Sequence, residues 1–113
     1  MTPDDFRRLA VALEGAEESA HMGHPDFRVG GRIFATLSGE ALSRGMVRLP
    51  PEQQQLFVEA HPAAFAPVPG SWGAQGCTYI GLADADPDVV ETALRAAWMH
   101  RGASPPARRL AKS

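Results

Sequence analysis

The sequence has little of several features that identify whole classes of protein. It contains a single cysteine, Cys77, among 113 residues. One thiol cannot close a disulfide within the chain and cannot build a cysteine metal cage, so disulfide-stabilised folds and cysteine-rich zinc folds are excluded. A reducing compartment is compatible with such sparing use of cysteine.

Long apolar runs and an excess of positive charge are also missing. No stretch approaches the roughly 20 apolar residues that cross a bilayer, and Met1 leads directly into a helix start rather than into a secretory leader. We therefore expect a cytoplasmic protein with no membrane partner. The net charge is −2 and the isoelectric point is about 6.0, whereas strongly nucleic-acid-binding domains have values above about 9. Any basic surface must therefore be local.

The chain does contain enough apolar sequence for one folded domain. Hydrophobic residues make up 44% of it, which argues against wholesale disorder. A domain of about this length buries roughly two-thirds of its unfolded surface. We expect a single domain over residues 1–103, followed by a basic, proline-containing tail over residues 104–113.

Helix signals stand at both ends of this domain. Residues 2–5 combine a capping threonine, a proline suited to the first helical position and two acids that favour the positive end of the helix dipole. An apolar stripe at helical spacing follows, and Gly15 is well placed to end the helix. Asp86 caps the start of a last helix that Gly102 closes, and residues 51–60 predict a short helix between them.

The most informative segment is a pair of apolar, β-prone runs separated by two glycines. Residues 27–37 read Phe-Arg-Val-Gly-Gly-Arg-Ile-Phe-Ala-Thr-Leu, and Gly-Gly between such runs strongly predicts a hairpin. A tight turn would form two cross-strand pairs, Val29 with Arg32 and Arg28 with Ile33. That register leaves neither face cleanly apolar, and a β-bulge at Gly31 would sort the two faces better.

The order of the remaining elements predicts the fold class. Further strands are expected over residues 46–49 and 77–82, so that the chain runs helix, three strands, short helix, strand, helix. Strands clustered between terminal helices are typical of an α+β fold. We expect an antiparallel sheet of about four or more strands, with helices packed on one face and the other face partly open to water.

No residue pattern in the chain predicts a reaction, a cofactor or a metal. His21 and His24 could bind a metal only with further ligands, and ordinary surface histidines explain the pair equally well. Residues 84–88 carry alternating aspartates but lack the glycine and glutamate that an EF-hand needs at its sixth and twelfth positions. Helix capping explains these aspartates better. We expect a noncatalytic protein that holds no cofactor and no metal.

Arginines of the predicted strands are the first candidates for a binding site. If Arg28, Arg32 and Arg48 share the open face with Phe34, the sheet offers cations beside an aromatic ring. Single-stranded nucleic acids use such surfaces through phosphate contact and base stacking. The alternative is a solvated face on which arginine stems lie over apolar neighbours.

A second candidate surface is the proline- and glycine-rich loop from Phe65 to Trp72. An apolar pocket with an aromatic wall favours small ligands. This loop therefore predicts a protein- or small-molecule-binding module as the alternative function. An open cleft under Trp72 would favour the ligand, whereas a buried Trp72 and a positive sheet face would favour the nucleic acid.

Three segments together resemble the MmcQ/YjbR family of small bacterial proteins over about residues 2–100. These are Ala16-Glu17-Glu18, the glycine hairpin over residues 27–35 and Pro51-Glu52-Gln53-Gln54. The resemblance implies a frataxin-like or CyaY-like α+β fold, in a double-wing arrangement suggestive of DNA binding.

Carried over position by position, the resemblance implies that Arg28 and Arg32 are the cations of the double wing and that Phe34 lies beside them. Two positions depart from the family pattern. Pro50 stands where many relatives have serine or threonine, and no cation accompanies Trp72 before the last strand. The resulting hypothesis is a binding domain that contacts DNA weakly and in a salt-sensitive way, because few phosphate contacts are available.

Overall fold

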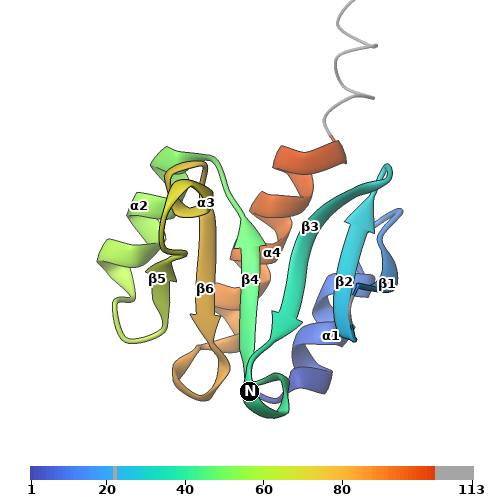
Figure 1. Cartoon of the computed structure of the whole chain (residues 1–113), viewed down its shortest axis with the longest axis horizontal. Coiled ribbons are helices and arrows are strands. Elements are labelled where there is room, and N and C mark those ends of the chain that lie inside the picture. Colours follow the sequence, from blue (N-terminus) through green and yellow to red (C-terminus); the bar gives the residue numbers. More distant parts are fainter. Residues whose placement is uncertain (22, 104–113) are drawn as a thin grey trace, which may run out of the picture.

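The structure is a computed structural model that describes residues 1–21 and 23–103 (Figure 1). Its centre is a six-stranded sheet with the strand order β1-β2-β3-β4-β6-β5, in which every neighbouring pair is antiparallel. The strands are β1 (Glu17–His21), β2 (His24–Val29), β3 (Arg32–Ser38), β4 (Arg44–Arg48), β5 (Phe65–Pro67) and β6 (Cys77–Gly81).

The long helices lie behind the sheet in Figure 1 and leave much of its front face uncovered. Helix α1 (Pro3–Val11) and helix α4 (Pro87–Trp98) pack against the central strands, and α2 (Pro51–Ala60) lies beside β5. A one-turn helix, α3 (Ser71–Ala74), precedes β6, and α4 continues into a π-helical turn, η3 (Met99–Ala103). The predicted α+β class, with an antiparallel sheet and helices on one face, is confirmed.

Both predicted helix starts are present, and local hydrogen bonds explain them. Thr2 accepts a hydrogen bond from the Asp5 backbone N–H at 3.1 Å, and Asp5 accepts one from the Thr2 N–H at 2.9 Å. This capping box lowers the pKa of Asp5 below its ordinary value, mainly through the bond from the Thr2 backbone. Asp86 accepts from the Asp88 N–H at 2.8 Å. Helix α1 ends at Val11, before the predicted stop.

A β-bulge in the β2–β3 hairpin decides which residues reach the core. The turn glycines have φ of +59° and +80°, and the predicted pairs beside them, Val29 with Arg32 and Arg28 with Ile33, are confirmed. The next pair is Phe27 with Ala35, so β3 has one extra residue, Phe34, at this point. The bulge was predicted at Gly31. It lies instead at Phe34, further along β3, so that Phe34 and Ala35 both face the helices.

The core lies between the sheet and the two helices behind it. Its largest fully buried side chains include Phe6, Phe27, Phe34, Leu37, Leu49, Ile80 and Leu94. Gly45 makes close packing possible, because a Cβ there would lie 2.7 Å from the Phe6 ring. Gly102 likewise allows η3 to pack closely against β2, because a Cβ at this position would lie 2.8 Å from the Val29 carbonyl oxygen. These close contacts hold α1 and η3 against one face of the sheet, whose other face is the open one.

Three elements were not predicted. Strand β5 and helix α3 form within residues 63–76, which the sequence indicated only as a loop. The edge strand β1 was not among the expected strands either. Among the described residues, no helix is long and apolar enough to cross a membrane. The predicted basic tail, 104–113, lies outside the described residues.

Candidate functional site

The open face of the sheet carries a row of half-buried side chains across three central strands. Cross-strand pairing aligns Thr36 of β3 with Met46 of β4, and Met46 in turn with Tyr79 of β6. Arg48 pairs with Cys77 in the next row. Because side chains alternate along a strand, these residues point away from the core that their neighbours fill.

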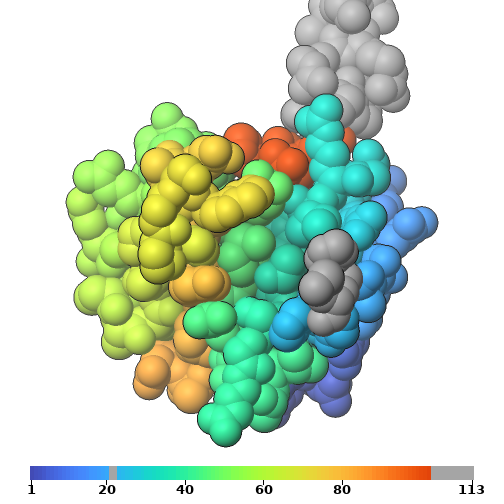
Figure 2. Space-filling view, viewed as in Figure 1, coloured from blue at the N-terminus to red at the C-terminus, as the bar shows by residue number. Residues whose placement is uncertain are grey.

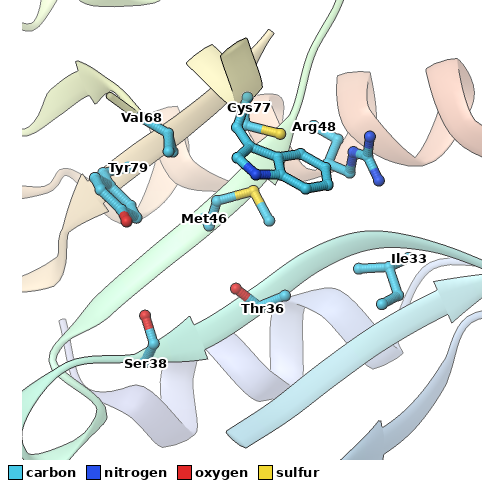
Figure 3. Close-up of a pocket in the computed structure, with 9 residues that line it drawn as sticks. Ile33, Thr36, Ser38, Met46, Arg48, Val68, Cys77 and Tyr79 are labelled. Carbon is cyan, nitrogen blue, oxygen red and sulfur yellow. The ribbon is translucent and has the colours of Figure 1, made fainter. Parts of the chain in front are cut away.

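This row forms the floor of a groove with a volume of about 320 Å³. Figure 3 shows Ser38 and Tyr79 toward one end and Ile33 and Arg48 toward the other, with Thr36 and Met46 between them. The complete lining consists of Ile33, Thr36, Ser38, Met46, Arg48, Val68, Trp72, Cys77 and Tyr79. Most of this lining is apolar, with two hydroxyl groups on the β3 side.

Trp72 is the most prominent side chain of the groove, and 58% of it is exposed. The segment that contains α3 lies over the sheet in Figure 2. Large exposed apolar groups that border a concave surface are typical of interaction sites. The open cleft expected for a ligand-binding module is therefore present beside Trp72.

Two glycines and one glutamine hold α3 at this position. Gly73 and Gly76 pass so close to the backbone that a Cβ would lie 1.8 Å from the Val68 oxygen and 1.7 Å from the Leu49 oxygen, respectively. The Gln54 side chain of α2 donates to the carbonyl oxygens of Gly73 and Cys77, both at 3.0 Å. No side chain can be added at these glycines without moving α3, so they are sequence signals for the site.

An arginine lies against each of the two aromatic rings of the groove. The Cζ atom of Arg48 is 5.6 Å from the centre of the Trp72 ring, and that of Arg44 is 4.1 Å from the centre of the Tyr79 ring. Both distances fit cation–π contacts. The two arginines therefore place positive charge beside an otherwise apolar surface.

Arg28, the first of the predicted binding residues, is bound to a neighbour. Its Nε and Nη2 donate to the two carboxylate oxygens of Asp26 at 2.9 and 3.2 Å, and only 2% of the Asp26 side chain is exposed. These hydrogen bonds and the negative charge raise the pKa of Arg28 above its ordinary value. The cation of Arg28 is thus neutralised within the protein.

Phe34 lies on the opposite face from the groove, and 0% of its surface is exposed. The expectation that Phe34 shares the open face with the arginines is wrong, because Phe34 lies on the same face of the sheet as Phe27 and Val29, and the helices cover that face. Arg32 is exposed beside the hairpin turn, and Arg48 lines the groove. Of the four predicted residues, only Arg48 therefore meets the groove, and Trp72 supplies the exposed ring.

One cation near the groove was not predicted. Arg101 of η3 donates from Nε to the carbonyl oxygen of Ile33 at 3.1 Å. Burial, and then repulsion from Arg48 and Arg32, lower the pKa of Arg101 below its ordinary value. Arg101 is therefore within electrostatic reach of both Arg48 and Arg32. No sequence signal indicated this group, because it depends on how η3 packs against β3.

Within residues 1–21 and 23–103, no three His, Cys, Asp or Glu side chains come together in a group that could hold a metal ion. Cys77 lines the groove but is buried, with 3% of its surface exposed.

Comparisons with known proteins agree with this fold. The family model described as YjbR matches residues 11–100. The crystal structure of protein DR2400 from Deinococcus radiodurans, with domain DUF419, has a TM-score of 0.73 and 20% sequence identity to the chain. That match covers 88% of this chain and 77% of the other. At this identity the likeness shows the fold alone. No curated protein sequence matches the chain significantly.

Proposed function

The chain belongs to the YjbR family, and we propose that it is a noncatalytic binding domain for a small molecule with a flat, apolar body. The groove beside Trp72 is the site. The single observation that carries this proposal is the exposed indole of Trp72 bordering an apolar groove on an uncovered sheet face.

The size and lining of the groove support a small ligand. A volume of about 320 Å³ is at the lower end of the range for small-molecule sites, which are roughly 300–1,000 Å³. Met46, Val68 and Tyr79 offer apolar contacts, while Thr36 and Ser38 offer hydroxyl groups that could fix the orientation of the ligand. This combination of many apolar contacts and few polar ones is typical of such sites.

The noncatalytic part of the proposal rests on the chemistry of the lining. None of the described residues that line the groove is a histidine, aspartate, glutamate or lysine. The hydroxyls and the Cys77 thiol therefore have no neighbouring general base of the kind that activates a nucleophile.

The test uses a neutral aromatic probe, 2-naphthalenemethanol, and the methyl resonances of 13C-labelled methionines. Met46 lines the groove, whereas Met99 lies at the far surface between α2 and α4. We expect a saturable shift of the Met46 methyl resonance, no shift at Met99 and loss of the effect in Trp72→Ala.

Leu56→Ala is the matched control for that variant, because Leu56 is also a large exposed apolar residue but does not line the groove. This variant should bind the probe like the unaltered protein. An unchanged Met46 resonance, or the same shift in Trp72→Ala, would contradict the proposal.

DNA binding is a second candidate, which the exposed ring of Trp72 with Arg48 against it favours, together with Arg101 in electrostatic reach of Arg48 and Arg32. Cations beside a free aromatic ring suit a single strand. Three phosphate contacts would give a slope of only about −2 for log K against log salt concentration. Fluorescence anisotropy of labelled single- and double-stranded oligonucleotides over a salt series tests this candidate, with Arg48→Gln as the variant expected to weaken binding.

A further inference from the structure

We propose that the ligand of the groove carries an oxyanion, either a carboxylate or a phosphate, and that Arg48 and Arg101 hold it. The site would lie at the end of the groove where β3 and β4 separate. This inference rests on the proposed function, because it names the chemical class of the ligand for the same groove.

The end of the β3–β4 ladder creates the place for such a group. Pairing between these strands stops at Ala35 and Val47, so Ile33 and Arg48 have no partner across this pair. Figure 1 shows the two strands diverging there, with α4 and η3 behind the gap. Ile33 and Arg48 both line the groove at this end.

Two arginines lie at Ile33. Arg101 donates to the Ile33 carbonyl oxygen at 3.1 Å, and Arg48 lines the groove together with Ile33. Figure 3 shows the Arg48 guanidinium on the Ile33 side of the groove, away from Tyr79. The two cations come from β4 and η3, so only the folded chain brings them together.

The charges of this group are not compensated within the described residues. Arg7, Arg8, Arg28 and Arg95 each lie within 4.0 Å of a carboxylate oxygen, whereas no such ion pair involves Arg32, Arg48 or Arg101 in that part of the chain. The hydrogen bond to Ile33 holds Arg101 in place although burial, and then repulsion from Arg48 and Arg32, lower its pKa. A bound oxyanion would relieve that repulsion.

The geometry of the arginine side chain indicates which anionic group the ligand carries. A guanidinium presents its N–H donors in a planar fork that matches a carboxylate or phosphate, and the resulting charge-assisted hydrogen bonds are strong. Arg48 also lies 5.6 Å from the Trp72 ring centre. An anion bound at Arg48 therefore places whatever is attached to it beside Trp72 and above Met46. An aromatic carboxylate or an aromatic phosphate monoester fits both requirements.

The experiment compares three probes that share one ring system: neutral 2-naphthalenemethanol, 2-naphthoate and 2-naphthyl phosphate. Affinities come from titrations of the Met46 methyl resonance in the full chain. We expect each anion to bind at least about tenfold more tightly than the neutral probe. This advantage should fall in Arg48→Gln and Arg101→Gln.

Arg44→Gln is the control variant, because Arg44 lies over Tyr79, toward the opposite end of the groove from Arg48. It should keep the full advantage of the anions. Arg101→Gln removes a hydrogen bond to the backbone, so its fold is checked by thermal unfolding. Arg48→Gln changes a half-buried side chain of the groove and provides the test if Arg101→Gln does not fold.

Each other outcome overturns a defined part of the proposal. Equal affinity of the neutral and anionic probes at Met46 would overturn the oxyanion site and leave the binding groove standing. No shift at Met46 with any probe would overturn the proposed function itself. If inorganic phosphate bound as tightly as 2-naphthyl phosphate, the claim that the ligand has an aromatic body would be overturned. A single-stranded oligonucleotide could also displace 2-naphthyl phosphate. If it did so at a concentration of phosphate groups below that of the probe, the arginines would be assigned to nucleic-acid binding instead.

Discussion

Arg28 and Asp26 form a two-bond fork on the sheet, with Nε–Oδ1 at 2.9 Å and Nη2–Oδ2 at 3.2 Å. The carboxylate of Asp26 is buried, whereas the arginine is partly exposed. A buried carboxylate needs such a partner, because water cannot solvate it. The pair therefore gives Arg28 a structural role in place of the ligand contact that the sequence suggested.

Replacing Arg28 with alanine should lower the midpoint of thermal unfolding. The variant leaves the Asp26 carboxylate buried without its two donors, and the loss should exceed that caused by Arg8→Ala, a substitution at an exposed ion pair. The double variant Asp26→Ala with Arg28→Ala should recover part of the loss. Circular dichroism melting curves provide the measurement, and equal midpoints for Arg28→Ala and Arg8→Ala would contradict the structural role.

Gly45→Ala should destabilise the domain by about 1–3 kcal/mol through overpacking. The added Cβ would lie 2.7 Å from Cε1 and 3.0 Å from Cζ of Phe6, which is fully buried between α1 and β4. Gly81→Ala is the matched control on β6, since its Cβ would meet nothing closer than 3.9 Å. Urea unfolding measures both variants, and a similar free energy of unfolding for the two would show that the Phe6 contact is not limiting.

Phe34 and Trp72 should respond to substitution in opposite ways. Phe34→Ala removes a fully buried ring and should lower the free energy of unfolding by about 3–5 kcal/mol. Trp72→Ala, at a largely exposed ring, should change that free energy by no more than about 0.5 kcal/mol but abolish binding of 2-naphthalenemethanol. Chemical denaturation and the Met46 titration together distinguish the two roles. The milder Phe34→Leu should stay folded and bind the probe normally.

His100 should titrate below its ordinary pKa of 6.5. Burial is the main cause, followed by repulsion from Arg101 and Arg48, while Glu52 acts in the opposite direction. A lowered pKa means that the unfolded chain binds more protons than the folded one between the two values. The contribution of His100 to stability is then complete above pH 6.5 and is lost as the pH falls through the folded pKa.

NMR titration of the His100 imidazole measures this pKa directly. Arg101→Gln should raise it by removing a nearby positive charge, and bound 2-naphthyl phosphate should raise it as well. Arg95→Gln, on the exposed side of α4, is the control and should leave it unchanged. A pKa at or above 6.5 in the unaltered protein would contradict the burial and charge that the structure shows around this residue.

Much of the fold could be predicted because its signals are local. The caps at Thr2 and Asp86 act within one helical turn, and the hairpin follows from two adjacent glycines. The family resemblance, confirmed over residues 11–100, rested on segments of the same kind. Strand β5 has only three residues, so its pattern is too short to predict a strand.

The candidate site was harder to predict because it depends on faces and packing. The tight-turn register left neither face of the hairpin cleanly apolar, because the extra residue Phe34 reverses the faces of Ala35 and of the residues after it. Trp72 was named only as part of a loop, and its position over the sheet follows from backbone contacts at Gly73 and Gly76. Arg101 was not predicted as part of the site, because the residues near it in the fold are distant from it in the sequence.

The order of amino acids alone specified where helices begin, where the chain reverses and that the domain would be α+β, because each depends on a few adjacent residues. Folding in three dimensions decided that Phe34 is buried, that Arg28 is paired with Asp26 and that Trp72 and Arg48 border one groove. Those outcomes depend on which strands pair, in which register, and on how closely separate segments approach. Such long-range geometry leaves little trace in a local pattern of residues.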